Sequence, residues 1–534
     1  LYSSFDYAIK NFNIYGAYSN DRSNISLIQH EDKAFNNIEF IKYPPFENNS
    51  NIHIDNNSNQ YTLGADYHIN SSNIISIEHS LTKDPHNEYS ERFIISQING
   101  EQSDNSNSRL YELSNSNNFT SQLTYLFHDE RNDIKVNFGY NYYKHSLNNN
   151  YYLSDTLYFT QENMALKNYA KLDLSFNRVL SENLQLEVGY GGTWQNTELS
   201  SVFNYEPRGM SLQDYSRNLV YSYLIFNPHE KISTRLGLSS EYSKYSLTDT
   251  DYSFINYYPL LNMQYKFNNK TTFTLKYRSS GEYPRIDQLT PYLTQKDVVT
   301  GEVGNPSISP SNLQKVSLNI GLLDGGFDIE PYYSFNNNYI DRAGEVKDNI
   351  FLFTYVNIDK YQKYGTNLAF EFNFLKNFYW NSAANVYWSK AMYGSYENSL
   401  FDWSSNLSLL YFYPRYESII AIMLKKENVK NISAFGYYTD NNDYLALYFD
   451  QSFFKGRLNL SILYTLPVDL GLKYTIDEKF DHLQYKEYRR TDVSLVSNLL
   501  MINFTFRLNN IRYDRSIKKK NLWEDESKKR GLLF

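Results

Sequence analysis

The chain has no cysteine among its 534 residues and only 13 prolines. Without cysteine, it can hold neither a disulfide scaffold nor a thiolate metal site. Its longest apolar run, at residues 419–424, is far shorter than the roughly 18 residues that a membrane-spanning helix needs. The net charge of −8 offers no basic surface of the kind that binds nucleic acid. Spanning helices, disulfide-rich scaffolds and nucleic-acid partners are therefore excluded.

Alternation of apolar and polar side chains dominates what the chain does contain. Roughly twenty segments of about ten residues follow this pattern, which is typical of the strands of outer-membrane barrels. In residues 171–176, for example, Leu172, Leu174 and Phe176 alternate with charged or polar residues. Successive strand side chains point to opposite faces, so each segment has one apolar and one polar side. Aromatic residues make up 17% of the chain and suit the two membrane–water interfaces.

Short turns alternate with longer connections rich in Asn, Ser and Asp. Long connections are expected at residues 21–58, 84–115, 282–311 and 467–483. In outer-membrane barrels, short turns face the periplasm and long loops face outward. The sequence therefore predicts an all-β fold, a transmembrane antiparallel up-and-down β-barrel with long extracellular loops and short periplasmic turns.

The strand segments number about 21, whereas single-chain bacterial barrels have even numbers of strands. The first segment, near Phe5, is short. We therefore expect about 22 strands, with the first strand truncated or missing before Leu1. The expected organisation is a barrel over residues 1–510 and a polar, basic tail over residues 511–534.

A soluble all-β adhesin or propeller is an alternative interpretation of the same alternation. It would require a repeat of roughly 40–50 residues with matching motifs. The segments are evenly spaced but share no repeated motif. A membrane barrel therefore accounts for the pattern better than a soluble adhesin or propeller does.

No constellation of residues indicates catalysis. The nucleophile elbow and the phosphate-binding glycine loop are absent, and the carboxylates are too dispersed to nominate a catalytic pair. The nine histidines are scattered. His79 and His86 flank the start of an expected loop, but no carboxylate frame accompanies them in the sequence. We therefore expect no enzyme, no cofactor and no metal site.

The stretch from Tyr283 to Pro310 contains ordered motifs: Tyr-Pro-Arg-Ile-Asp-Gln-Leu-Thr-Pro-Tyr, followed by Gly-Asn-Pro-Ser-Ile-Ser-Pro. Residues 332–341 and 355–365 add an Ile-Asp pair and an Asn-Ile…Tyr-Gly segment. Together they resemble TonB-dependent outer-membrane receptors, and most closely an outer-membrane β-barrel family abundant in Bacteroidetes. Pro284 precedes Arg285 where many relatives have the arginine first. The resemblance implies a barrel in the outer membrane of a Gram-negative bacterium, in contact with outer-membrane lipid.

Five residues of this stretch are candidates for binding a ligand or partner: Tyr283, Arg285, Tyr292, Asn305 and Pro306. Exposed aromatic rings in outer loops can stack on a ligand. The structural alternative is that the prolines stiffen the loop and that the rings belong to the aromatic girdle.

The resemblance implies a receptor or transporter that binds an extracellular ligand in its outer loops for gated import. A TonB-type energising protein would then act through a plug that is not in this chain. The alternative is a non-transporting barrel that scaffolds an envelope complex for surface-lipoprotein export, secretion or outer-membrane protein assembly. Its partners would be surface lipoproteins or other subunits of that complex.

Overall fold

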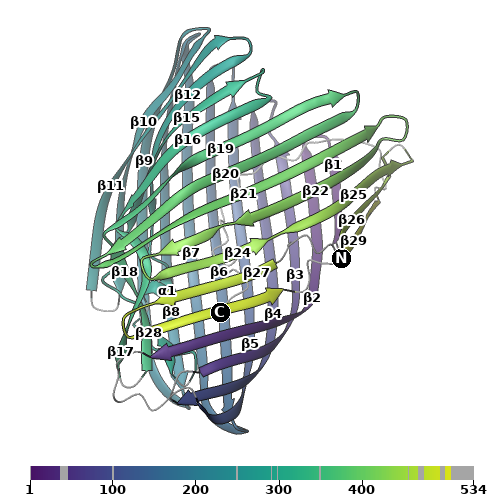
Figure 1. Cartoon of the computed structure of the whole chain (residues 1–534). Helices are drawn as coiled ribbons and strands as arrows, with labels where there is room; N and C mark the ends of the chain where they lie inside the picture. Colours follow the sequence, from purple (N-terminus) through teal and green to yellow (C-terminus); the bar gives the residue numbers. More distant parts are fainter. Residues whose placement is uncertain are drawn as a thin grey trace.

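A computed structural model describes residues 2–35, 46–98, 101–247, 250–289, 291–297, 299–347, 350–454, 456–466, 474–493 and 499–506. Nearly all of these residues lie in antiparallel strands, which form one large curved sheet and one small sheet (Figure 1). Among the described residues, no helix is long and apolar enough to cross a membrane.

Strands of the large sheet follow one another in chain order, each pairing with the next. The first twelve are β1 (Tyr2–Ile9), β2 (Phe12–Phe35), β3 (Phe46–His68), β4 (Asn73–Ile98), β5 (Glu101–His128), β6 (Asn132–Leu153), β7 (Thr156–Ser181), β8 (Leu184–Phe203), β9 (Glu206–His229), β10 (Ile232–Leu247), β11 (Thr250–Asn268) and β12 (Thr271–Glu282). The series continues with β15 (Ser311–Leu322), β16 (Phe327–Asn337), β19 (Lys360–Leu375), β20 (Phe378–Tyr393), β21 (Tyr396–Tyr413), β22 (Ser418–Asn428), β25 (Tyr444–Phe453), β26 (Leu458–Thr465) and β29 (Leu500–Phe506).

Four further strands complete the 25 of the large sheet: β23 (Lys430–Ser433), β24 (Gly436–Asn442), β27 (Tyr474–Asp481) and β28 (Tyr485–Val493). They lie beyond β22, β25, β26 and β29, at the end of the sheet away from the short turns, which we call the outer end. The other 21 strands form the up-and-down series, as the count from the sequence predicted. The strand expected before Leu1 and the tail over residues 511–534 lie outside the described residues.

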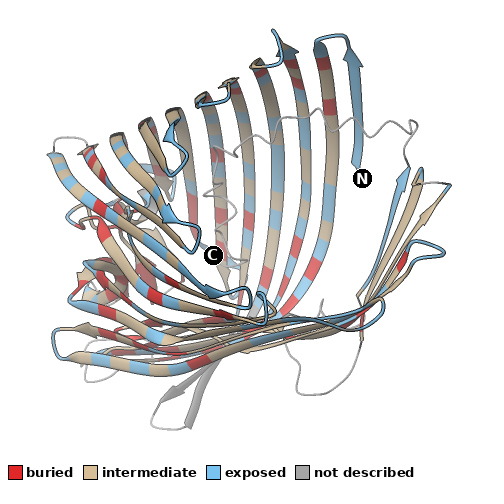
Figure 2. Ribbon diagram, turned by 90° about the horizontal axis from the view of Figure 1, so that it is seen from above, coloured by how far each residue is buried: buried red, intermediate tan, exposed pale blue. Residues whose placement is uncertain are grey.

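β28 joins the last strands to the beginning of the sheet at the outer end. It pairs with β2 over nine positions, from Leu27↔Val493 to Phe35↔Tyr485. No pairing joins β1 to β29 in the part of the chain that the structure describes. Figure 2, seen from above, shows the sheet curving around a wide interior, with β1 at one edge.

Side-chain exposure confirms the predicted two-faced strands. Large apolar side chains such as Leu174 on β7, Leu236 on β10 and Ile422 on β22 are exposed on the outside of the sheet. The inner face of β7 instead carries Lys171 and Asp173, whose charged groups are 3.6 Å apart. This arrangement places apolar side chains against lipid and charges in an aqueous interior.

The alternation reverses its sense along the outer part of β2 and β3. On β2, the polar residue Asn13 faces inward near the short turn, but farther out the same face carries Ile25 and Leu27. These two side chains pack with Ile52 and Ile54 of β3. The outer surface there carries polar residues such as Asn24. Above the bilayer the outside meets water, so the apolar residues turn inward to a packed interior.

Two of the expected long loops are paired strands instead. β2 and β3 pair almost continuously from Phe12↔Tyr67 to Lys33↔Phe46, and thus across most of residues 21–58. β4 and β5 likewise pair across most of residues 84–115, from Asp84↔Ser116 to Ile98↔Glu101. The sequence interpretation was wrong here because Asn and Ser were taken as loop residues. In a hairpin that extends into water on one side, they serve as the solvent-facing positions of strands.

The small sheet comes from the two connections β12–β15 and β16–β19. Its strands are β13 (Thr294–Gln295), β14 (Thr300–Glu302), β18 (Ile350–Ile358) and β17 (Tyr339–Lys347), in that order, and a single turn of helix, α1 (Ile286–Leu289), precedes them. Residues 283–310 and 338–359 together are called the mouth insert below. The connection expected over residues 282–311 is thus confirmed, with secondary structure of its own.

Candidate ligand-binding site at the outer mouth

The mouth insert packs on the inner face of the outer wall through an aromatic core. Phe351 and Phe353 of β18 are almost fully buried and contact Phe480 of β27 and Tyr485 of β28. The rings of Phe351 and Tyr485 stack with centroids 4.3 Å apart. On another part of the wall, buried Val299 packs with aromatic residues of β6 and β7. The insert is therefore a folded part of the barrel interior and not a free loop.

Asn305 and Pro306, two of the predicted site residues, lie in a loop fastened to β18 and α1. The Asn305 side-chain amide donates to the carbonyl of Tyr355 at 2.8 Å, and its side-chain oxygen accepts from the backbone of Ser307 at 2.9 Å. The Asn305 backbone donates to the carbonyl of Gln288 at 2.6 Å. Pro306 is half-buried. These contacts give the Gly-Asn-Pro motif an architectural role in the insert.

Arg285 lies on the other side of the same helical turn. Its backbone donates to the side-chain oxygen of Gln288 at 2.8 Å, so Gln288 links Arg285 to Asn305. Arg285 is exposed, whereas Tyr292 is half-buried. The structure thus brings Arg285 and Asn305 to one turn of chain, and the binding role assigned to both stays a prediction.

Tyr283 lies apart from that turn, in a cluster on the inner wall. Its hydroxyl is 3.2 Å from that of Tyr258 on β11, and the guanidinium of Arg217 on β9 lies 5.1 Å from its ring centroid. Tyr258 donates to Glu241 of β10, which also pairs with Arg217. With one ring face next to Arg217, Tyr283 anchors the start of the insert to the wall. The binding role assigned to it likewise stays a prediction.

A buried charge network connects the insert to β2, β27 and β28. From the insert come Asp297, Lys296, Glu302 and Arg342; from the wall come Lys33, Glu31, Arg489, Glu487 and Glu478. Pairs up to 458 positions apart in sequence take part in it. Sequence reasoning missed these residues because charged side chains in alternating segments were all expected to face water.

Two contacts connect the parts of this network across the interface. Lys33, 2% exposed, pairs with Asp297 and lies 3.3 Å from Glu31. Arg342 donates to Glu478 at 2.5 Å while its guanidinium covers the ring of Phe353. Breaking a buried pair by removing one partner is far more costly than breaking an exposed one, because it leaves an uncompensated charge. The network therefore ties the position of the insert to specific partners.

The pKa values of two carboxyl groups in the insert are shifted in opposite directions. Burial would raise the pKa of Glu302, but the charges of Lys296 and Arg342 and a hydrogen bond from Tyr355 outweigh it and lower the pKa to about 2. Burial raises the pKa of Asp341 to about 7, although two backbone amides donate to this carboxyl group. Between pH 7 and about 4, Asp341 favours the folded insert increasingly as the pH falls.

We predict that the docked insert loses stability in acid, over the pH range in which the Glu302 carboxylate takes up a proton. Because its folded pKa is below the usual 4.5, its stabilising contribution is present above pH 4.5 and is lost as the pH falls through 2. The shift corresponds to about 3 kcal/mol. Hydrogen exchange of β14 and β18 amides, corrected for intrinsic rates, should show protection falling between pH 4.5 and 2. In Glu302→Gln the fall should be shallower; an equally steep fall would contradict this assignment.

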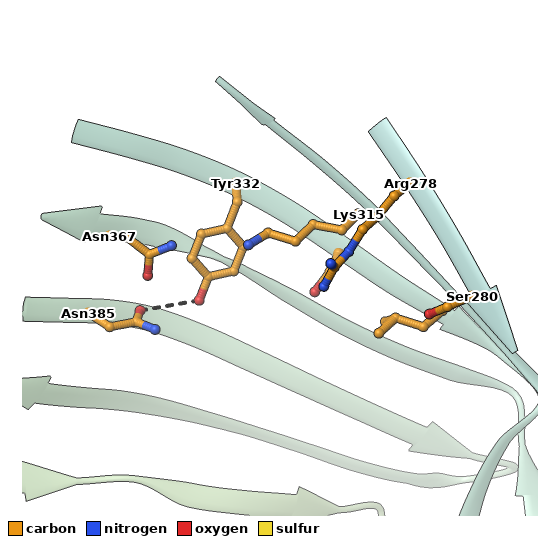
Figure 3. A pocket seen from close by; sticks show the side chains of 8 residues that line it. Arg278, Ser280, Lys315, Tyr332, Asn367 and Asn385 are labelled. Carbon is orange, nitrogen blue, oxygen red and sulfur yellow. Dashed lines mark hydrogen bonds between the residues drawn. The ribbon is translucent and has the colours of Figure 1, made fainter. Parts of the chain in front are cut away.

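A polar cavity of about 250 Å³ lies on the inner wall, on the strands that carry the insert. Its lining comes from β12, β15, β16, β19 and β20: Arg278, Ser280, Leu313, Lys315, Tyr332, Ser334, Asn367 and Asn385. Figure 3 shows the labelled side chains pointing toward one another, with Tyr332 bonded to Asn385 at 3.2 Å.

Positive charge exceeds negative charge around this cavity. Lys315 and Lys276 share one carboxylate, Glu330, at 3.3 and 3.1 Å. The Arg278 side chain is exposed to the interior, and its guanidinium makes no ion pair or hydrogen bond within the part of the chain that the structure describes. The cavity therefore offers cations and side-chain amides to an anionic or hydrogen-bond-accepting group. None of its residues was predicted from the sequence to bind a ligand, because their proximity depends on strand register.

Comparison with known proteins agrees with this architecture. The copper transporter OprC superposes with a TM-score of 0.55 at 8% identity, over 90% of this chain and 86% of that chain. The ferripyoverdine receptor of the outer membrane of Pseudomonas aeruginosa, bound to ferripyoverdine, gives 0.53 at 8% identity, over 90% and 76%. At such identities the likeness shows the fold alone. No curated protein sequence matches.

The family itself is shown by sequence. The family model described as the outer membrane protein beta-barrel family matches residues 125–511, well over half of the chain. The predicted location in the Gram-negative outer membrane and the predicted β-barrel fold are thereby confirmed. This chain belongs to the outer membrane protein beta-barrel family.

Proposed function

We propose that this barrel binds an extracellular ligand at its outer end and imports it by gated passage. The observation that carries the proposal is the cationic cavity on the inner wall, below the docked mouth insert. Arg278 and Lys315 lie four or fewer residues from the points where β12 and β15 meet the insert. A ligand held there would contact the inner wall and lie next to the mouth insert.

The insert supports the gating part of this proposal. It is fastened to the wall by two buried ion pairs, Lys33–Asp297 and Arg342–Glu478, and removing one partner of such a pair is costly. A displacement that separates Arg342 from Glu478 would break a buried ion pair between the insert and the wall, so docked and released positions would be distinct states. Passage would also involve a plug, and the energising partner would be a TonB-type protein. The proposal includes binding and passage but no catalysis.

A comparison of growth media tests import while the ligand is still unidentified. Wild-type cells and cells lacking the gene are grown in parallel, and the solutes depleted from each medium are compared by mass spectrometry. We expect at least one solute whose depletion requires the gene and stops when an uncoupler dissipates the proton gradient. Ferric siderophores and copper complexes belong in the medium because structural neighbours include a ferripyoverdine receptor and a copper transporter.

Variants connect the transport result to the cavity. Arg278→Ala should slow depletion of that solute, because its cation has no other partner among the described residues. Lys270→Ala, in a short turn at the opposite end, is the matched control and should transport normally. If no solute depends on the gene and an envelope lipoprotein co-purifies stably in detergent, the scaffold alternative would replace the transporter.

A further inference from the structure

Two neighbouring strands bring a histidine and two glutamates together on the inner face, away from the mouth insert. His86 and Glu88 lie two residues apart on β4 and therefore share a face. Glu112 of β5 pairs directly with Glu88, and Asn56 of β3 pairs directly with His86. Both β4 positions lie more than ten residues beyond the short turn that precedes this strand. They are thus outside the roughly ten residues that cross a bilayer.

The three ionisable side chains have the spacing of metal ligands. One imidazole nitrogen and one oxygen from each carboxylate all lie within 4.8 Å of one another. His86 Nε2 is 3.9 Å from Glu88 Oε2. His86 and Glu88 are half-buried, and Glu112 is buried. An ion placed between these atoms would contact all three after small side-chain rotations.

The orientation of His86 leaves its Nε2 atom available to bind a metal. Its Nδ1 forms a hydrogen bond with the side-chain oxygen of Asn56, an atom that can only accept. Nδ1 therefore carries a proton, and Nε2 is the ring nitrogen on the side of Glu88. Metal-binding histidines are commonly oriented in this way, by a hydrogen bond from the nitrogen that does not bind the metal.

Asn149 provides an independent indication of a missing group. It lies on β6 directly opposite Glu112 and on the same inner face. The side chain is 9% exposed, and its Oδ1 has no hydrogen-bond partner among the described residues. Buried polar atoms are nearly always satisfied, so an orphaned oxygen at this position requires an explanation. A bound cation would provide one.

We propose that His86, Glu88 and Glu112 bind a divalent transition-metal ion, with Asn149 as a further oxygen donor. One imidazole and two carboxylates form a donor set that suits Zn²⁺, with a fourth position for an amide oxygen or water. The ion would neutralise two carboxylates that face each other across β4 and β5. It would tie three long hairpin strands together in the part of the wall outside the membrane.

Titration of the purified full-length protein in detergent with ZnCl₂ tests this site. We expect one zinc ion per chain for the wild type and loss of that binding in His86→Gln and in Glu112→Gln. Asn56→Ala keeps all the ligands but removes the orienting hydrogen bond, so zinc affinity should fall by roughly 10–100-fold. His79→Gln is the matched control, since this ring is on the opposite face of β4 and stacks on Phe119. It should bind zinc like the wild type.

Two results would overturn the proposal. If the wild type binds no zinc, His86 and Glu88 form an ion pair without a metal. If His86→Gln and Asn56→Ala bind zinc as tightly as the wild type, the ion is bound elsewhere in the chain. Circular dichroism and the electrophoretic mobility of unheated samples show whether each variant is folded. The absence of cysteine and the small number of histidines leave few competing sites.

Discussion

Replacing Lys33 by Met should destabilise docking of the mouth insert by about 3–5 kcal/mol, because it leaves a buried carboxylate without its cation. Lys33 is 2% exposed and pairs with Asp297, which is itself 5% exposed. Burial alone would lower the pKa of Lys33, but the charges of Asp297, Glu31 and Glu487 outweigh it and raise the pKa. Lys33 is therefore charged in the docked state, and methionine replaces its length but not its charge.

Hydrogen exchange of the amides next to Asp297 measures the loss of docking stability. The amides of Val299 and Thr300 donate to Asp297 and should exchange more than about a hundredfold faster in the variant. Lys244→Met is the matched control, since Lys244 pairs with Asp251 at an exposed position. Its exchange should equal that of the wild type. Unchanged protection of Val299 and Thr300 in Lys33→Met would show that the charge network does not hold the insert.

An arginine placed on the lipid face of β7 should destabilise the barrel by almost as much as Lys33→Met destabilises docking of the insert. Leu174 is exposed on the outside of the sheet, and Ser175, the next residue, faces the interior. An arginine near the bilayer midplane costs about 2–4 kcal/mol on the lipid face of a barrel. Leu174→Arg should therefore lower the free energy of unfolding by an amount in this range, measured by urea titration in lipid bilayers.

Ser175→Arg is the control for that experiment because it adds the same side chain at nearly the same depth. The interior already accommodates the Lys171–Asp173 pair next to it. We expect a stability close to that of the wild type, since water can solvate the new charge. Equal losses in the two variants would mean that both faces of β7 have the same surroundings, which contradicts a barrel in lipid.

Alternation was sufficient to predict the strands, their number in the up-and-down series and the faces of those in the membrane. It is a local property: Leu172 and Leu174 alternate with polar residues because lipid lies on one side and water on the other. Short turns were likewise predictable from residues that adopt left-handed backbone angles, such as Asn377 at φ 70°.

The outer part of the barrel could not be predicted by the same rule, because its surroundings differ. Ile25 and Leu27 turn inward there, and Asn-rich segments that read as loops continue as strands. Nothing in the local sequence marks where the bilayer ends and the apolar face changes sides.

The sites depend on pairings between distant residues. Arg489 meets Glu31 across 458 positions, and the carboxylates near His86 come together only through the register of β4 and β5. In the sequence, no set of carboxylates accompanied His86, whereas the fold places Glu88 and Glu112 next to it. By contrast, the Gly-Asn-Pro segment was identified from the sequence because its residues are contiguous.

The most direct test of the account is the environment of neighbouring side chains on one strand. The chain has no cysteine, so single cysteines at Leu174 and Ser175 can each carry one nitroxide label. In lipid bilayers, paramagnetic resonance should show the label at 174 relaxed by oxygen, which concentrates in lipid, and the label at 175 relaxed by a water-soluble nickel chelate. The same preference at both positions, or the reverse assignment, would contradict an apolar surface that faces hydrocarbon around an aqueous interior.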